Sequence, residues 1–313
     1  MKIYYGLKSF RENAPRKKPF AIAIGIFDGV HRAHQKILKK LVGESRRKSL
    51  RSLVITFWPH PEDVVKGEGK KVPHITSLRH RLRLIGGMGV DFALVIRFTR
   101  KLAGMEAAGF ARAITEGIPV NEIITGSNFY FGRNKRGTPE FLKKFSRGRF
   151  KVTAIKVARS GGKPISSTRI RNLILDGRLK EAQHLLSRPV TVLGTVVKGK
   201  GRGRFLGFPT ANIDPHHEAI PPSGVYAVRV KLEGKEYKGI LNIGTRPTFE
   251  SGKERAEPVM EVNLFGFTGN MYGRDLEIMF AKRIRSERRY RNPEELRNRI
   301  MQDAFLARKI LAR

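Results

Sequence analysis

The sequence predicts an α/β protein of two domains, a mainly parallel sheet followed by an antiparallel β-barrel with a C-terminal helix. Between residues 20 and 157, apolar runs of strand length alternate with amphipathic stretches, a pattern typical of parallel sheets with helical crossovers. Beyond residue 188, short apolar runs follow one another across Gly/Pro turns with no helix between them. The length of 313 residues is enough for two hydrophobic cores.

The first domain, residues 1–187, takes its strands from five apolar runs. These runs are AIAIGIF (21–27), SLVITFW (52–58), FALVIRF (92–98), NEIITG (121–126) and FKVTAIKV (150–157). Helices are expected over HQKILKKLV (34–42) and MEAAGFARAI (105–114), where apolar residues recur at helical spacing. Because strands and helices alternate, we expect a Rossmann-like sheet that binds its ligands beyond the carboxyl ends of the strands.

The second domain, residues 188–313, follows a helical passage near residues 166–186. Its strands are expected over VTVLGTVV (190–197), GVYAVRVKL (224–232), KGILNIG (238–244), VMEVNLF (259–265) and LEIMFAKRI (276–284). A final helix is predicted from Pro293 to about Leu311, because Asn292 is a good N-cap and acidic residues fill the first turn.

Composition restricts the partners and the compartment. The chain has no cysteine, which excludes disulfides and thiolate metal sites and suits a reducing compartment. No apolar run has the length of a membrane span and the N-terminus lacks a signal-peptide core, so we expect a cytoplasmic protein without a membrane partner. The net charge of +36 attracts polyanions nonspecifically, but no nucleic-acid-binding motif accompanies it, and no specific nucleic-acid partner is predicted.

The first chemical motif is the break between the strand 21–27 and the helix that follows. Gly25 and Gly29 permit a sharp turn around Phe27 and Asp28. Such a strand-to-helix turn presents backbone N–H groups and the positive end of a helix dipole to phosphates. The next residues include His31 and His34, three positions apart and therefore on one helical face. The pattern indicates nucleotide chemistry.

Three more segments fall at the same edge of the predicted sheet. His60 and Pro61 follow the second strand, and Asn128 and Phe129 follow the fourth. The hydroxyls of Ser166, Ser167 and Thr168 open a helix, where they can cap it and also bind phosphate. Arg171, one turn inside that helix, can reach phosphates held at its N-terminus.

The second domain carries a glycine-rich basic stretch and a carboxylate. Glycines at 199, 201 and 203 allow backbone N–H groups to close on phosphates, and Arg204 adds charge. In an extended segment Thr210 and Asn212 point to the same side and offer two neutral oxygens to Mg²⁺. Glu261 lies opposite the apolar face of its strand.

These segments resemble the bacterial bifunctional riboflavin kinase/FAD synthetase family along nearly the whole chain. The matching motifs are GIFDGVHRAH (25–34), TFWPHP (56–61), GSNFYFG (126–132), ISSTRIR (165–171) and GFPTAN (207–212). The resemblance implies two reactions: phosphorylation of riboflavin to FMN by ATP with Mg²⁺, and adenylylation of FMN to FAD with release of pyrophosphate. Flavins are then substrates and products.

The resemblance also implies roles for individual residues. The residues implied in catalysis are His31, His34, Arg171 and Glu261. Those implied in nucleotide binding are Gly25, Phe27, Asp28, Gly29, Ser166, Ser167, Thr168, Gly199, Gly201, Gly203 and Arg204. Those implied in flavin binding are His60, Pro61, Asn128, Phe129, Asn242 and Arg285, and those implied in Mg²⁺ binding are Thr210 and Asn212.

The first domain departs from the family pattern at two positions. The family has glycine where this chain has Ala33, and aspartate where it has Asn128. One alternative is therefore a riboflavin kinase with weak or altered nucleotidyl transfer. Another, from a different class, is a basic nucleic-acid-binding or regulatory protein on a flavin-enzyme scaffold, which the charge of +36 would serve.

Overall fold

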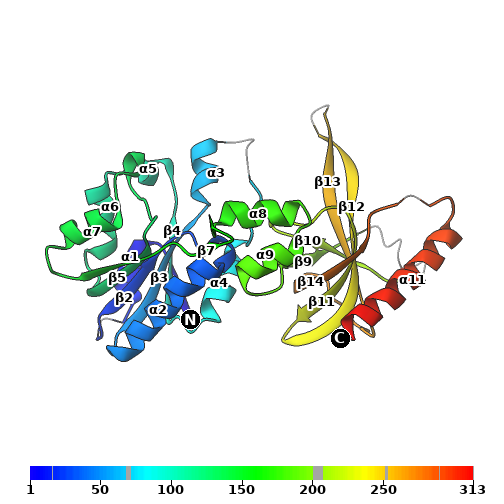
Figure 1. The fold of residues 1–313 in the computed structure, drawn as a ribbon, viewed down its shortest axis with the longest axis horizontal. Helices are drawn as coiled ribbons and strands as arrows, with labels where there is room; N and C mark the ends of the chain where they lie inside the picture. The colour runs from blue at the N-terminus through cyan, green and yellow to red at the C-terminus, as the bar shows by residue number, and fades with distance from the viewer. Residues whose placement is uncertain (16, 68–71, 200–206, 251–252, 289, 313) are drawn as a thin grey trace. The chain divides into compact units, whose positions relative to one another are not determined.

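The computed structural model describes residues 1–313 except 16, 68–71, 200–206, 251–252, 289 and 313 (Figure 1). The chain divides into two compact units. The first comprises Met1–Pro73 and Leu78–Arg169, and the second comprises His74–Ser77 and Ile170–Arg313. The predicted domain boundary between residues 187 and 188 stays a prediction.

The first unit is built on a six-stranded sheet in which every pair of neighbouring strands is parallel. Its strands are β1 (Lys2–Tyr5), β2 (Phe20–Ile24), β3 (Arg51–Trp58), β4 (Phe92–Arg97), β5 (Val120–Gly126) and β6 (Lys151–Ile155). The order is β1-β4-β3-β2-β5-β6, so the chain steps outward from β2 in one direction and returns to its other side with β5. The carboxyl ends of β2 and β5 therefore form the switch point where such sheets bind ligands.

Helices supply the crossovers of the first unit. They are α1 (Leu7–Asn13), α2 (Arg32–Arg47), α3 (Pro61–Lys66), α4 (Leu78–Gly86), α5 (Arg100–Ala103), α6 (Ala107–Thr115) and α7 (Pro139–Ser146). Strand β2 is buried along its whole length and contributes alternate residues to two cores. Ile22 and Ile24 pack in one core, whereas Ala21 and Ala23 pack with α2 in the other. The parallel sheet is thus covered on both faces, as its continuous apolar runs predict.

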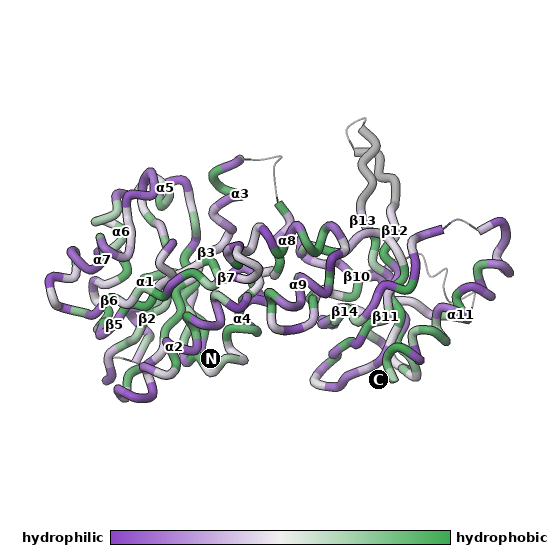
Figure 2. Tube along the Cα trace, viewed as in Figure 1, coloured by the Kyte–Doolittle hydropathy of each residue, from purple (hydrophilic) through white to green (hydrophobic). Residues whose placement is uncertain are grey.

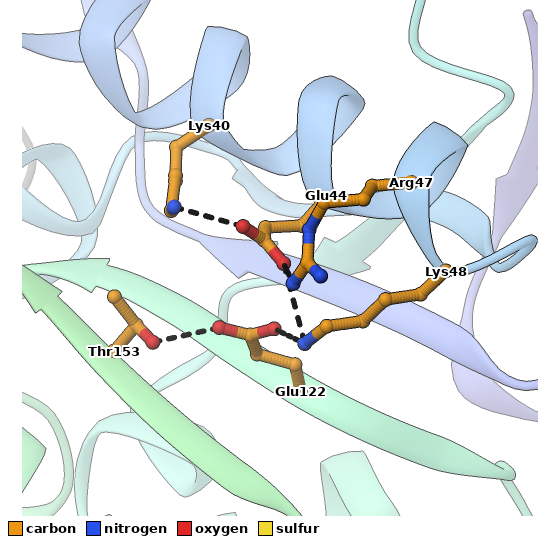
Figure 3. Close-up of polar contacts among 6 residues, drawn as sticks. All are labelled: Lys40, Glu44, Arg47, Lys48, Glu122 and Thr153. Atoms are coloured by element: carbon orange, nitrogen blue, oxygen red, sulfur yellow. Dashed lines mark hydrogen bonds and ion pairs between the residues drawn. The ribbon is translucent and has the colours of Figure 1, made fainter.

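An ionic network around the buried Glu122 connects the end of α2 to the sheet near the amino-terminal end of β5 (Figure 3). Glu122 is fully buried; its carboxylate lies 2.6 Å from Lys48 Nζ and accepts a 2.7 Å hydrogen bond from Thr153 Oγ1. Lys48 also lies 3.3 Å from Glu44, which pairs with Lys40 and Arg47. Burial raises the pKa of Glu122, but the contacts with Lys48 and Thr153 outweigh it and hold the pKa below its ordinary value.

The second unit contains a closed six-stranded antiparallel barrel, in the order β10-β13-β12-β11-β14-β9. Its strands are β9 (Thr191–Val197), β10 (Ala211–Asp214), β11 (Gly224–Leu232), β12 (Lys235–Glu250), β13 (Lys253–Leu264) and β14 (Asp275–Arg285). Helices α8 (Ser167–Leu175) and α9 (Leu179–Leu186) precede it, and α8 begins in the first unit. The predicted fold class is confirmed. The elements that the sequence analysis missed include β1 and β10 and the helices α1, α3, α4, α5 and α7.

Helix α11 (Pro293–Leu311) has the predicted bounds, and it packs against the barrel. The Asn292 side chain accepts a 2.8 Å hydrogen bond from the N–H of Glu295, which confirms the expected N-cap. Ala307 and Leu311 are buried in a cluster with Val225 and Ala227 of β11. The helix is thereby fixed against the strand that lies next to β12 and β14.

Apolar residues concentrate in the sheet of the first unit and in the barrel strands, drawn green in Figure 2. The outward face of α2 exposes charged side chains, among them Lys36 and Lys39. Among the described residues, no helix combines the length and the hydropathy needed to cross a bilayer.

Candidate active sites

The turn after β2 is built from residues with a left-handed backbone. Phe27 has a φ of 56°, Gly29 a φ of 74° and Val30 a φ of 38°. Non-glycine residues at positive φ are uncommon and persist where the surroundings determine the turn. A side chain at Gly25 would place its Cβ 3.2 Å from the Phe27 ring, so glycine makes room for that ring. The predicted break in the chain is confirmed, and Asp28 at its centre is 1% exposed.

His31 and His34 stack on each other at the start of α2. Their ring centroids are 3.6 Å apart with an interplanar angle of 16°. His31 Nδ1 accepts a 3.4 Å hydrogen bond from the N–H of His34, so His31 is the N-cap and, when neutral, carries its proton on Nε2. Burial, followed by the charges of His31 and Arg81, holds the pKa of His34 well below its usual value. His34 is therefore a neutral imidazole at neutral pH.

The hydroxyls at the start of α8 meet this turn. Ser167 Oγ donates a 3.0 Å hydrogen bond to the carbonyl oxygen of Asp28, although 139 positions separate the two residues. Ser166 Oγ accepts from the N–H of Arg169 at 3.3 Å and so caps the helix. Thr168 is exposed, whereas Arg171, farther along α8, is 5% exposed and therefore buried. The ISST segment (165–168) thus both caps α8 and contacts the turn after β2.

Two further predicted segments follow the carboxyl ends of β3 and β5. His60 is 5% exposed, and its Nδ1 accepts a 3.2 Å hydrogen bond from the N–H of Glu62, so that it caps α3 ahead of Pro61. Asn128 is exposed in the loop after β5, and Phe129 is half-buried. Since the strands are parallel, both loops leave the same edge of the sheet as the turn at 27–30.

The barrel aligns its predicted residues in one register row. Glu261 on β13 is paired directly with Asn212 on β10 and with Asn242 on β12. Directly opposed residues of antiparallel strands present their side chains on the same face, with Cβ atoms about 5 Å apart. Met260 and Val262 are fully buried on the other face, which confirms the predicted apolar side of β13. A half-buried carboxylate therefore lies between two amides, a set that can accept a proton and offer oxygen ligands.

The chain around this row is held close to it. A Cβ on Gly199 would overlap the side-chain amide of Asn212, so glycine there leaves the space that Asn212 occupies. Asn263 Nδ2 donates a 2.7 Å hydrogen bond to the carbonyl oxygen of Pro209, just before Thr210. Gly201, Gly203 and Arg204 lie outside the described residues.

Arg285 continues the row across the barrel, because it pairs with Val225 of β11, whose other partner is Asn242. Its guanidinium lies 2.7 Å from Asp303 Oδ2 of α11 and 5.6 Å from the centroid of the Tyr290 ring. Asp303 is 1% exposed, so the pair is largely withdrawn from solvent. The ion pair that fixes Arg285 was not predicted from the sequence.

Arg81 is a further residue that the sequence analysis missed. It is 2% exposed on α4, and it donates to the main-chain carbonyls of Ile26 and Phe57. The helical spacing could have indicated its burial, because Arg81 shares the inward face of α4 with the buried Leu82 and Ile85. A cation on an apolar helical face must find partners inside the protein.

Comparison with known proteins assigns both halves of the chain. The family model of FAD synthetase matches residues 13–169, and that of riboflavin kinase matches residues 186–311. The "Bifunctional riboflavin kinase/FMN adenylyltransferase" of Bacillus subtilis is 35% identical over 90% of this chain and 89% of its own length. The protein of the same name from Escherichia coli K12 is 35% identical over 99% of this chain and 97% of its own.

A solved structure described as a macrolide-efflux protein from Streptococcus pneumoniae has the same fold. It is 28% identical, with a TM-score of 0.82, and the match covers 98% of this chain and 99% of that one. The two family models follow each other along the chain as the two predicted sites do, and the named relatives span both. The chain belongs to the family of bifunctional riboflavin kinase/FMN adenylyltransferases.

Proposed function

We propose that this chain converts riboflavin to FMN at the barrel and FMN to FAD at the parallel sheet, with ATP as the second substrate of both reactions. The observation that carries the first reaction is the register row of Asn212, Glu261 and Asn242. The second reaction is supported by the contact between Ser167 and the Asp28 turn beside the stacked histidines. The family relationship supports both.

In the kinase reaction Glu261 acts as the general base. Its carboxylate accepts the proton of the riboflavin 5′-hydroxyl while that oxygen forms a bond to the γ-phosphorus of ATP. The bond from the γ-phosphorus to the bridging oxygen breaks, and ADP leaves. Asn242 and Arg285, in the same row, are assigned to the flavin, and Gly199 with the glycine-rich stretch after it to the nucleotide.

The oxygens of Thr210 and Asn212 would hold Mg²⁺ with the phosphates of ATP. The donor set fits the ion, because Mg²⁺ prefers oxygen ligands, and Gly199 leaves the Asn212 amide room beside Glu261. The metal supplies neutralisation of phosphate charge. The hydrogen bond from Asn263 to the carbonyl of Pro209 holds the residue directly before Thr210 in place.

In the adenylyl transfer a phosphate oxygen of FMN attacks the α-phosphorus of ATP in line, and pyrophosphate leaves. This chemistry needs positioning and charge stabilisation rather than a side-chain nucleophile. His31 and His34 donate hydrogen bonds to the phosphates beside the turn formed by Gly25, Phe27, Asp28 and Gly29, and Arg171 adds charge. Ser166 to Thr168 bind the nucleotide at the start of α8. His60, Pro61, Asn128 and Phe129 are assigned to the flavin.

Product analysis tests the function directly. Riboflavin with ATP and Mg²⁺ should give FMN and ADP, and supplied FMN should give FAD and pyrophosphate in equal amounts. A chain that makes FMN and no FAD would be a riboflavin kinase alone. A chain that turns over neither flavin but binds RNA at a defined stoichiometry would instead be the nucleic-acid-binding alternative. We place these reactions in the cytoplasm, which the absence of cysteine suits.

A further inference from the structure

The side chain of Arg81 connects the carboxyl ends of β2 and β3 by hydrogen bonds to the main chain of both. Its Nη1 donates a 2.6 Å hydrogen bond to the carbonyl oxygen of Ile26, and its Nη2 donates a 3.2 Å hydrogen bond to that of Phe57. Strands β2 and β3 are neighbours in the parallel sheet. The planar guanidinium therefore spans two adjacent strand ends at one fixed spacing, which a single-point donor cannot do.

Both carbonyls lie within three residues of a residue assigned to the adenylyl-transfer site. Ile26 precedes the left-handed Phe27 and the turn that leads to the stacked histidines. Phe57 lies three residues before His60, which caps α3. The carbonyl of Ile26 also accepts a 3.1 Å hydrogen bond from Thr56 Oγ1 of β3, so both of its acceptor positions are used within the protein. The start of the turn is thus fixed from two sides.

The charge of Arg81 acts on the same turn. Burial lowers the pKa of Arg81 to about 10, while Asp28 acts in the opposite direction, so the guanidinium stays charged at neutral pH. Its positive charge is one of the causes that keep the pKa of His34 low, after burial and together with His31. Arg81 therefore contributes a fixed positive charge close to Asp28 and His34 without contacting solvent.

We propose that Arg81 is a positioning residue for adenylyl transfer, which sets the spacing of the Phe27–Gly29 turn and the His60 loop and places a buried positive charge beneath the phosphate-binding turn. This inference rests on the proposed function of the first unit. Because adenylyl transfer depends on alignment of the reacting groups, a displacement of about 1 Å in either loop lowers the rate about 10²-fold.

The test compares Arg81→Met and Arg81→Lys with Arg83→Met, an exposed arginine of the same helix. Arg81→Met should lower kcat for FAD formation from FMN about 10²-fold. Arg81→Lys should retain part of the rate, since the ammonium keeps the charge but lacks the planar, forked arrangement of donors that fits the two carbonyls. Arg83→Met should leave FAD formation unchanged. FMN formation by the barrel, assayed on the same preparations, should stay within about twofold in all three variants, since it depends on residues of the other unit.

A second readout separates positioning from general destabilisation. In Arg81→Met the His34 ring should titrate at a higher pH than in the unaltered chain, as followed by NMR of labelled histidine, because a positive charge beside it is gone. FAD formation in Arg81→Met equal to that in Arg83→Met, an unmoved His34 titration, or a parallel loss of FMN formation would each overturn the inference. If the unaltered chain makes no FAD, both the proposed function of the first unit and this inference fail. If the unaltered chain and Arg81→Met make FAD at equal rates, only this inference is overturned.

Discussion

The buried carboxylate of Glu122 allows a quantitative test of what holds the first unit together. Glu122→Gln preserves the shape of the side chain and removes its charge, so Lys48 loses its 2.6 Å ion pair while Thr153 can still form a neutral hydrogen bond. The side chain of Glu122 is 0% exposed and that of Lys48 is 25% exposed. The carboxylate therefore interacts at low dielectric, whereas the ammonium can be partly hydrated when it is left alone.

The expected cost follows from these exposures. Breaking a fully buried pair costs about 3–5 kcal/mol, and a hydrogen bond to a charged group contributes about 1.5–3 kcal/mol. In Glu122→Gln, Lys48 keeps its hydration and the 3.3 Å contact with Glu44. The free energy of unfolding should therefore fall by about 2 kcal/mol, within the range for a hydrogen bond to a charged group. Lys48→Met leaves the Glu122 carboxylate without its cation and should cost more, about 3–4 kcal/mol. The double variant should cost less than the sum, because the two residues form one pair.

Urea unfolding followed by the fluorescence of Trp58 measures this loss. Trp58 is the single tryptophan of the chain and ends β3, so its signal reports on the first unit. Glu122→Gln should lower the midpoint by about 1 M with an unchanged slope. Glu106→Gln is the matched control: its pair with Arg133 is 3.9 Å long and both side chains are exposed, so the change should be under about 0.5 kcal/mol. Equal midpoints for the two variants would refute the reasoning.

Three other outcomes follow from the structure. Gly199→Ala places a methyl group where the Asn212 amide lies, so FMN formation should fall at least about tenfold while FAD formation from supplied FMN is retained; equal rates would contradict the close approach. The pKa of His34 is lowered in the folded chain, so as the pH is lowered below 6.5 the unfolded chain takes up a proton at His34 before the folded chain does. The free energy of unfolding of the unaltered chain should therefore decrease on acidification more steeply than that of His34→Gln. Parallel curves would contradict the shift. Ala33→Gly restores the glycine that the family pattern has at this position and should lower KM for ATP in FAD synthesis, and an unchanged KM would show that Ala33 does not crowd the nucleotide.

Most of the fold could be predicted from the sequence because local pattern and tertiary structure agree. The continuous apolar run of β2 is buried on both faces, and the alternation of Met260, Glu261 and Val262 places the glutamate outward. The N-cap at Asn292 was equally readable, since one side chain satisfies one nearby N–H. Strands β1 and β10 have only four residues each, too few to show a period.

Contacts over long sequence separations could not be predicted. The carboxylate of Glu218 accepts hydrogen bonds from the N–H groups of Ser77, 141 positions away, and of Leu193, within the barrel unit. The ion pair of Arg285 with Asp303 and the reach of Arg81 to two strand ends depend equally on the completed fold. Local pattern shows that such a group is buried, but not which atoms it meets.

Separation of the two reactions by single substitutions tests the central claim most directly. Glu261→Gln and His31→Asn are assayed side by side for FMN formation from riboflavin and for FAD formation from supplied FMN. Glu261→Gln should lower FMN formation by about 10²–10⁴ and leave FAD formation intact, because it removes only the base at the barrel. His31→Asn should lower FAD formation alone. Loss of both products in either variant would contradict two separate active sites.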